Sequence, residues 1–188
     1  IGPALLLAAI TWASALPGAE SFPAPGSKLP PADADKLITA ADAAAERIGT
    51  SIPNSALGEP VGSVSLAPPR WVESANGRPA HLLVDGSIGA VDPGCPPINF
   101  RVALPAAWNR RSAQLGGGGM NGMIPNLTGS QLGKGFVTYG SDSGHQAAFG
   151  RNASPNANDW TLNDEAIRNL GYLQMKKTHD AAMVIIER

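Results

Sequence analysis

The stretch Ser112-Ala-Gln-Leu-Gly-Gly-Gly-Gly-Met-Asn-Gly122 is a short predicted strand that runs directly into four consecutive glycines. A second short strand is predicted for residues 136–140, and it ends at the polar turn Ser141-Asp-Ser-Gly-His145. Further along, Asn163 is a favourable N-cap for a helix that bends near Gly171. Strand, glycine-rich loop, strand and long helix is the order expected at the beginning of an α/β domain.

The segments before this stretch predict a helix and a hairpin. Residues 33–48 are rich in alanine and end before Gly49, which favours a helix, whereas residues 51–79 hold five prolines and predict no regular structure. Residues 82–89 and 98–104 predict two strands joined as an antiparallel hairpin, since the second alternates apolar with other residues. We therefore expect an α/β fold in which this hairpin leads into a mostly parallel sheet with helices.

The composition limits the partners. Of 188 residues, 14 are Lys or Arg and 15 are Asp or Glu, giving a net charge of −1. This balance excludes an extended basic surface, so we expect neither nucleic acid nor a membrane as partner. The single cysteine excludes an internal disulfide, and the three histidines have no partner at metal-ligand spacing. We therefore expect no metal or cofactor in this chain.

Both ends of the chain have distinctive patterns. Residues 4–12 are a short apolar run followed by Ala13-Ser14-Ala15, which is typical of a signal-peptide cleavage site. We interpret residues 1–19 as a signal-peptide remnant, 20–32 as a Pro-rich linker and 33–188 as the domain, and we expect an exported protein. A buried N-terminal helix is the alternative. Residues 185–188 carry no stop signal after a strong helical pattern, so the domain is expected to continue beyond Arg188.

The glycine-rich motif supports three hypotheses. Its flexible backbone could present N–H groups to a developing negative charge, as an oxyanion hole does. Alternatively, Gly117-x-Gly119-x-x-Gly122 matches the dinucleotide fingerprint of an oxidoreductase, with Asp142 at the position of a ribose-binding acid. Thirdly, the glycines could simply permit a tight turn in an exported module without catalysis.

The dinucleotide hypothesis requires a helix that begins at the last glycine. Residues 123–134 contain Pro125, Gly129 and Gly133, which makes them a poor helix. The pattern therefore favours the oxyanion loop over the plain turn, and the turn over the dinucleotide site.

The turn of residues 141–145 brings Asp, Ser and His together in sequence. Contiguous residues on one loop rarely form a catalytic triad, because triad members meet through the fold rather than along the chain. A G-x-S-x-G nucleophile motif occurs nowhere in the sequence. We expect a loop whose short polar side chains bond to local backbone groups.

Several motifs in series resemble the tannase and feruloyl esterase family. They are Pro97-Ile-Asn-Phe-Arg-Val-Ala-Leu-Pro105, Ala107-Trp-Asn109, Gly116-Gly-Gly-Gly-Met-Asn-Gly122, Gly135-Phe-Val-Thr-Tyr-Gly-Ser-Asp-Ser-Gly-His-Gln146, Trp160-Thr-Leu-Asn163 and Gly171-Tyr172. Their order and spacing agree with the family from about residue 79 to residue 188. The resemblance implies the N-terminal part of an α/β-hydrolase fold, and a secreted serine esterase acting on esters of aromatic acids.

The resemblance also implies roles for individual residues. Gly119 matches the glycine whose backbone N–H binds the oxyanion, Gly118 and Met120 support it, and Asp142 and His145 match a signature near the site floor. The serine nucleophile, in a Cys-Ser-x-Gly-Gly elbow, the catalytic Asp and His, and a lid domain with a calcium site are implied beyond Arg188. The expected partners are a small aromatic ester and the remainder of the same hydrolase domain.

Overall fold

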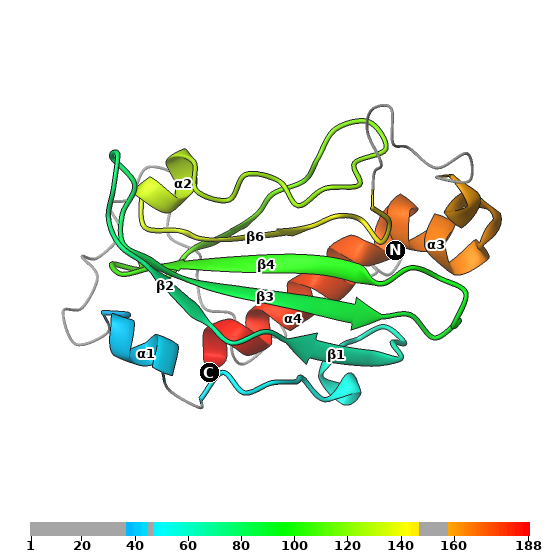
Figure 1. Ribbon diagram of the computed structural model, residues 1–188, viewed down its shortest axis with the longest axis horizontal. Coiled ribbons are helices and arrows are strands. Elements are labelled where there is room, and N and C mark those ends of the chain that lie inside the picture. The colour runs from blue at the N-terminus through cyan, green and yellow to red at the C-terminus, as the bar shows by residue number, and fades with distance from the viewer. Residues whose placement is uncertain (1–36, 45–46, 147–157) are drawn as a thin grey trace, which may run out of the picture.

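The computed structural model describes residues 37–44, 47–146 and 158–188 (Figure 1). The predicted signal-peptide remnant and linker lie outside these residues. The strands are β1 (Ser63–Leu66), β2 (Arg70–Val72), β3 (His81–Gly89), β4 (Ile98–Pro105), β5 (Ser112–Gln114) and β6 (Val137–Ser141). The α-helices are α1 (Ala40–Ala44), α2 (Ser130–Gly133), α3 (Asp164–Arg168) and α4 (Gln174–Glu187). Two 3-10 helices, Asn54–Ala56 and Asp159–Leu162, and a π-helical turn, Asn169–Leu173, complete the regular structure of the described residues.

The strands form one six-stranded mixed sheet with the order β1-β3-β4-β6-β5, while β2 pairs with another part of β3. The predicted hairpin is confirmed, since β3 and β4 pair antiparallel from His81↔Pro105 to Ile88↔Ile98. β6 inserts between β4 and β5, antiparallel to β4 and parallel to β5. The α/β class is therefore confirmed, but within the described residues the parallel pairing is confined to β5 and β6, so this part of the sheet is not mostly parallel.

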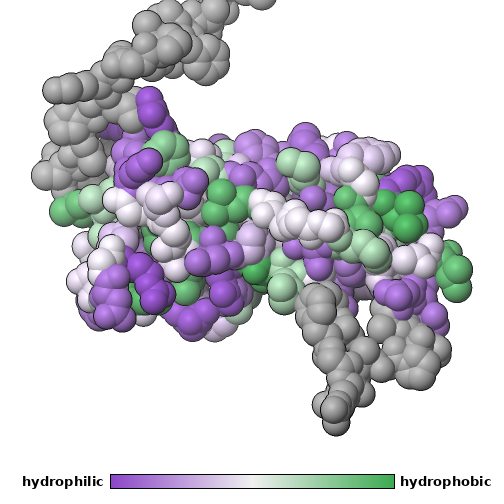
Figure 2. Space-filling view, turned by 90° about the horizontal axis from the view of Figure 1, so that it is seen from above, coloured by the Kyte–Doolittle hydropathy of each residue, from purple (hydrophilic) through white to green (hydrophobic). Residues whose placement is uncertain are grey.

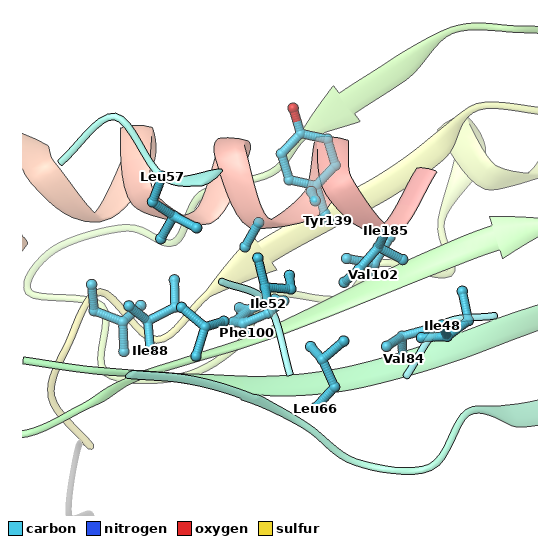
Figure 3. Packing of buried hydrophobic residues seen from close by; sticks show 14 of the residues in the cluster. Ile48, Ile52, Leu57, Leu66, Val84, Ile88, Phe100, Val102, Tyr139 and Ile185 are labelled. Carbon is cyan, nitrogen blue, oxygen red and sulfur yellow. The ribbon is translucent and has the colours of Figure 1, made fainter. Parts of the chain in front are cut away.

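The two faces of the sheet are covered by different elements. α4 crosses one face, and Figure 3 shows Ile52, Phe100 and Ile185 directed into the space between this helix and the strands. On the opposite face, Leu127 and Leu132, from the segment that includes α2, pack on Leu83 and Ala103. Removing these side chains from water is the main favourable term in folding.

The N-terminal helix is shorter than predicted. Residues 37–39 are not helical, and α1 begins at Ala40 rather than at Asp33. The reason is a local cap: the backbone N–H and the hydroxyl of Thr39 both donate to Oδ2 of Asp42, at 2.7 and 3.0 Å. A carboxylate that reaches back to the N-cap N–H fixes the first turn of a helix at that residue.

The predicted C-terminal helix starts where expected. Oδ1 of Asn163 accepts the N–H of Ala166 at 3.0 Å, which confirms Asn163 as the N-cap of α3. The predicted bend near Gly171 takes the form of the π-helical turn Asn169–Leu173, after which α4 continues. Such turns often mark functional sites.

Candidate functional site

The glycine loop, residues 116–122, follows β5 at the carboxyl end of the parallel pair. The N–H of Leu115 donates to the carbonyl of Tyr139 at 2.7 Å, which extends the pairing of β5 with β6 by one residue. The chain then reverses in a β-turn of residues 118–121, closed by the N–H of Asn121 and the carbonyl of Gly118 at 3.0 Å. Gly119 has φ +60°, whereas Met120 does not have a positive φ. This combination is typical of a type II′ turn, which favours glycine at its first central position.

The backbone N–H groups in the first part of this loop have no hydrogen-bond partner among the described residues. Within the described part of the chain, the N–H groups of residues 116–120 make no hydrogen bond, and all five residues are exposed. A run of glycines leaves no side chains to cover these groups. Successive unpaired N–H groups in a tight turn form a site suited to an anionic oxygen.

The turn of residues 141–145 lies directly behind the loop. The side-chain amide Nδ2 of Asn121 donates to the carbonyl of Ser141 at 3.0 Å and to Oγ of Ser143 at 2.7 Å. Ser143 and Gly144 both have positive φ, at 68° and 85°. The glycine loop is therefore tied by a side chain to the end of β6.

Asp142 is 3% exposed and has a structural role in this turn. Its Oδ1 accepts the N–H groups of Asn99 and Gly144, both at 3.0 Å. Its Oδ2 accepts the side-chain amides of Asn99 at 2.8 Å and Gln146 at 2.7 Å. The carboxylate is fully occupied in joining β4 to the turn, as the sequence predicts for a loop of local polar contacts.

His145 is also 3% exposed, and its ring stacks on Trp160, with centroids 4.0 Å apart and an interplanar angle of 18°. Burial lowers the pKa of His145, whereas the Asp142 carboxylate and a hydrogen bond to the backbone of Met120 act in the opposite direction. Nδ1 of His145 has no partner among the described residues. His145 is thus a buried side chain whose pKa is lowered by its burial.

A pocket of about 180 Å³ separates the glycine loop from the start of the C-terminal helix. Gly119 and Asn121 line it on one side, and Leu170 of the π-helical turn and Met175 of α4 line it on the other. Oγ of Ser141 donates to Oε1 of Gln174 at 2.7 Å in its floor. Of the predicted site residues, Gly119 lines this pocket, Gly118 and Met120 flank it in the same turn, and Asp142 and His145 lie behind it.

The surface around this loop is mixed in character. The side chains of Met120 and Met175 are 53% and 56% exposed. On the face seen in Figure 2, apolar side chains are interspersed with hydrophilic ones. A second cavity, of about 570 Å³, lies between α1 and the end of α4 and is lined by none of the predicted site residues.

The geometry does not suit a dinucleotide. No helix begins at Gly122; the next helix is the four-residue α2, which begins at Ser130. The carboxylate of Asp142, expected to bind a ribose, is taken up by Asn99, Gly144 and Gln146. The loop therefore lacks the helix N-terminus that holds a pyrophosphate in such sites.

Two further features concern the described residues alone. They hold no group of three or more His, Cys, Asp or Glu side chains that could bind a metal ion. Among the helices of this part of the chain, none is long and apolar enough to cross a membrane.

Sequence patterns missed three residues of this site. Asn121 is part of the glycine motif and has φ 54°, a conformation in which asparagine is enriched, so its position could have been noticed. Gln174 and Trp160 reach the site through the packing of α4 and of the 3-10 helix Asp159–Leu162, which no local pattern reports.

Comparison with known proteins supplies independent information. The model of the family described as "Tannase and feruloyl esterase" matches residues 83–188. An uncharacterized esterase of Agrobacterium fabrum is 38% identical over 152 residues, which cover 73% of this chain and 26% of that protein. The mono(2-hydroxyethyl) terephthalate hydrolase of Piscinibacter sakaiensis is 31% identical over 129 residues, covering 61% of this chain and 21% of the hydrolase.

A solved structure is also similar. The crystal structure of feruloyl esterase B from Aspergillus oryzae aligns with a TM-score of 0.48 and 20% identity, over 79% of this chain and 28% of that one. The chain spans about a quarter of the length of the curated relatives that it matches.

Proposed function

Because the chain belongs to the tannase and feruloyl esterase family, we propose that it forms part of a serine esterase that hydrolyses esters of aromatic acids. The description of the family names feruloyl esterases, and one relative is named a mono(2-hydroxyethyl) terephthalate hydrolase; both names support this substrate class. The partners of the chain would be a small aromatic ester and the rest of the hydrolase domain.

Within this reaction, the glycine loop would supply oxyanion stabilisation. The serine oxygen attacks the ester carbonyl, a histidine takes its proton, and the carbonyl oxygen becomes negatively charged in the tetrahedral intermediate. The observation that carries the proposal is the N–H of Gly119, which makes no hydrogen bond within the described residues and belongs to an exposed glycine turn beside a pocket. A donor aimed at that oxygen acts mainly in the transition state, and removing one typically costs about 10²–10³-fold in kcat.

The catalytic groups themselves would come from elsewhere in the protein. Asp142 is saturated with hydrogen bonds, and His145 is stacked on Trp160 with its pKa lowered by burial. Neither is placed to exchange a proton with a substrate in the pocket. We assign both to support of the loop, and we place the serine, its base and its acid outside these 188 residues, as the family resemblance implies.

We also propose that the protein is exported. The support is the apolar run of residues 4–12 followed by Ala13-Ser14-Ala15. A fusion of the N-terminal segment of the full-length protein, as far as residue 32, to a reporter that is active only after export tests this directly. A reporter that stays inside the cell, with its N-terminus uncleaved, would contradict export.

The activity is tested on the purified full-length protein. Hydrolysis of methyl gallate, methyl ferulate and mono(2-hydroxyethyl) terephthalate is measured beside an aliphatic methyl ester and a heat-denatured control. We expect turnover of at least one aromatic ester, abolished by a fluorophosphonate that labels one serine. An intact protein with no turnover of any ester would contradict the function, and full activity after complete labelling would contradict the serine nucleophile.

A further inference from the structure

The side chain of Asn121 occupies the interior of the glycine loop. A Cβ built on Gly117 would lie 1.7 Å from Oδ1 and 2.4 Å from Cγ of Asn121. Gly117 does not have a positive φ, and the three atoms nearest to such a Cβ all belong to the side chain of Asn121. Gly117 is therefore a glycine because Asn121 fills the space in which a side chain would stand.

The amide of Asn121 is not free to move aside. Its Nδ2 donates to the carbonyl of Ser141 and to Oγ of Ser143, and its backbone N–H closes the turn on Gly118. Three contacts from one residue thus join the first half of the glycine loop, the β-turn around Gly119, and the end of β6.

We propose that Asn121 is a positioning residue that holds the N–H of Gly119 in the geometry for oxyanion binding, an inference that rests on the proposed function. Of the loop's own side chains, only that of Asn121 makes a hydrogen bond within the described residues, since its glycines carry no side chains and Met120 is 53% exposed. A glycine-rich backbone samples many conformations unless something fixes it. The Asn121 amide replaces that freedom with one hydrogen bond to the last residue of β6 and one to Ser143 in the turn after it. β6 itself is paired on both sides in the sheet.

The proposal predicts a specific kinetic effect. Asn121→Gly tolerates the positive φ of this position and removes the side chain with its amide. Because an oxyanion donor acts in the transition state, we expect kcat to fall by about 10- to 100-fold while KM changes little. Asn126→Gly is the matched control, since Asn126 is an exposed loop asparagine whose Oδ1 accepts only from Thr128.

A second position makes the test sharper. Gly117→Ala should lower kcat, because its Cβ displaces the Asn121 amide. In the double variant Gly117→Ala/Asn121→Gly the obstacle to the new Cβ is gone, so Gly117→Ala should not lower kcat further. Independent losses that multiply in the double variant would overturn the proposal, and so would an unchanged kcat in Asn121→Gly. Gly133→Ala, at a glycine with no atom near a new Cβ, controls for adding a methyl group.

A readout without substrate separates this inference from the function. Hydrogen exchange, followed by mass spectrometry on the full-length protein, reports the amides of residue 121 and Ser143, which donate to Gly118 and to the Ser141 hydroxyl. We expect both amides to exchange faster in Asn121→Gly than in the wild type, and at the wild-type rate in Asn126→Gly. If the wild type hydrolyses no ester but these amides lose protection in Asn121→Gly, the proposed function fails while the positioning of the loop by Asn121 is supported. Unchanged exchange in Asn121→Gly would overturn the proposal that Asn121 positions the loop.

Discussion

Nζ of Lys177 lies 3.3 Å from Oε1 of Glu165, and the lysine side chain is 2% exposed against 14% for the glutamate. The pair joins α4 to α3 and is not symmetric. Glu165 also accepts the N–H groups of Val91 and Asp92, at 3.2 and 2.8 Å, and so holds the β3–β4 connection. The other contact of the ammonium is Oδ1 of Asn169 at 3.1 Å. The carboxylate is thus better supported without its partner than the ammonium is.

This asymmetry predicts unequal costs for removing either partner. Glu165→Gln leaves a buried ammonium without a counter-charge, and we expect a loss of about 3 kcal/mol in the free energy of unfolding. Lys177→Met leaves a carboxylate that keeps two backbone donors, and we expect a loss of about 1 kcal/mol. Urea denaturation of both variants measures the difference. Equal losses, or a larger loss for Lys177→Met, would show that the lysine and not the glutamate organises this junction.

The buried ring of His145 predicts a pH dependence of stability. Its pKa is lowered in the folded protein, below the value of 6.5 that the unfolded chain is expected to have. A group whose folded pKa is depressed contributes stability that is present above the unfolded pKa and is lost as the pH falls through the folded pKa. The wild type should therefore lose stability below pH 6.5 as this imidazole becomes charged against Trp160.

The matched variant is His145→Phe, which keeps a ring on Trp160 and removes the titration. Denaturation midpoints of both proteins at about pH 8 and about pH 5.5 give the comparison. From the higher to the lower pH, we expect the wild type to lose more stability than the variant, because only the wild type has the His145 imidazole. His81 and His179 are present in both proteins and do not contribute to the difference. Parallel losses would mean that His145 does not titrate in this range.

The strands that carry long apolar patterns could be predicted from the sequence, whereas short strands could not. β1 and β2 have four and three residues and lie between prolines, and they exist because β3 offers its edge to both. The insertion of β6 between β4 and β5 likewise depends on tertiary contacts and not on the local sequence pattern. The period of a strand shows that it has a buried face, but not which strand is its neighbour.

The site was predicted unevenly for a related reason. The turn at Gly119 follows from the need for a positive φ, a property of the residue itself. The tie between Asn121 and Ser143 depends on which segment lies behind the loop, and that is fixed by the pairing of β6. The loop could therefore be predicted from its own residues, whereas the contacts that hold it depend on how the strands pair in the sheet.

The base of the glycine loop predicts a further sensitive position, Gly140 in β6. A Cβ there would lie 2.5 Å from the carbonyl oxygen of Leu115 and 2.8 Å from Cγ of Pro125. The first obstacle is backbone and the second a rigid ring, so Gly140→Ala must move the loop. We expect a loss of about 1–3 kcal/mol in the free energy of unfolding, measured by urea denaturation. Gly133→Ala, with open space at its Cβ, is the control, and equal stability of the two variants would contradict the crowding.

The role of Gly119 needs a change that removes its N–H and nothing else. Proline is unsuitable, because its φ near −65° differs from the +60° of Gly119 and would rebuild the turn. Glycolic acid at position 119, introduced by suppression of a stop codon, converts the peptide N–H into an ester oxygen and keeps the freedom of φ. It also makes the Gly118 carbonyl, which closes the turn, a weaker acceptor, so the stability of this protein is measured alongside its kcat. Gly119→Ala is the complementary change, since it keeps the N–H and adds a methyl group in open space.

If the Gly119 N–H binds the oxyanion, the glycolate protein should lose about 10²–10³-fold in kcat on an aromatic methyl ester, with KM nearly unchanged. Gly119→Ala should retain most of its kcat and lose about 1 kcal/mol of stability, the strain of a positive φ. Gly77 has a similar φ, +75°, and equal space around a new Cβ, so Gly77→Ala should show the strain without any kinetic effect. A glycolate protein that folds normally and turns over the ester at the wild-type rate would remove Gly119 from the oxyanion hole and leave its loop a structural turn.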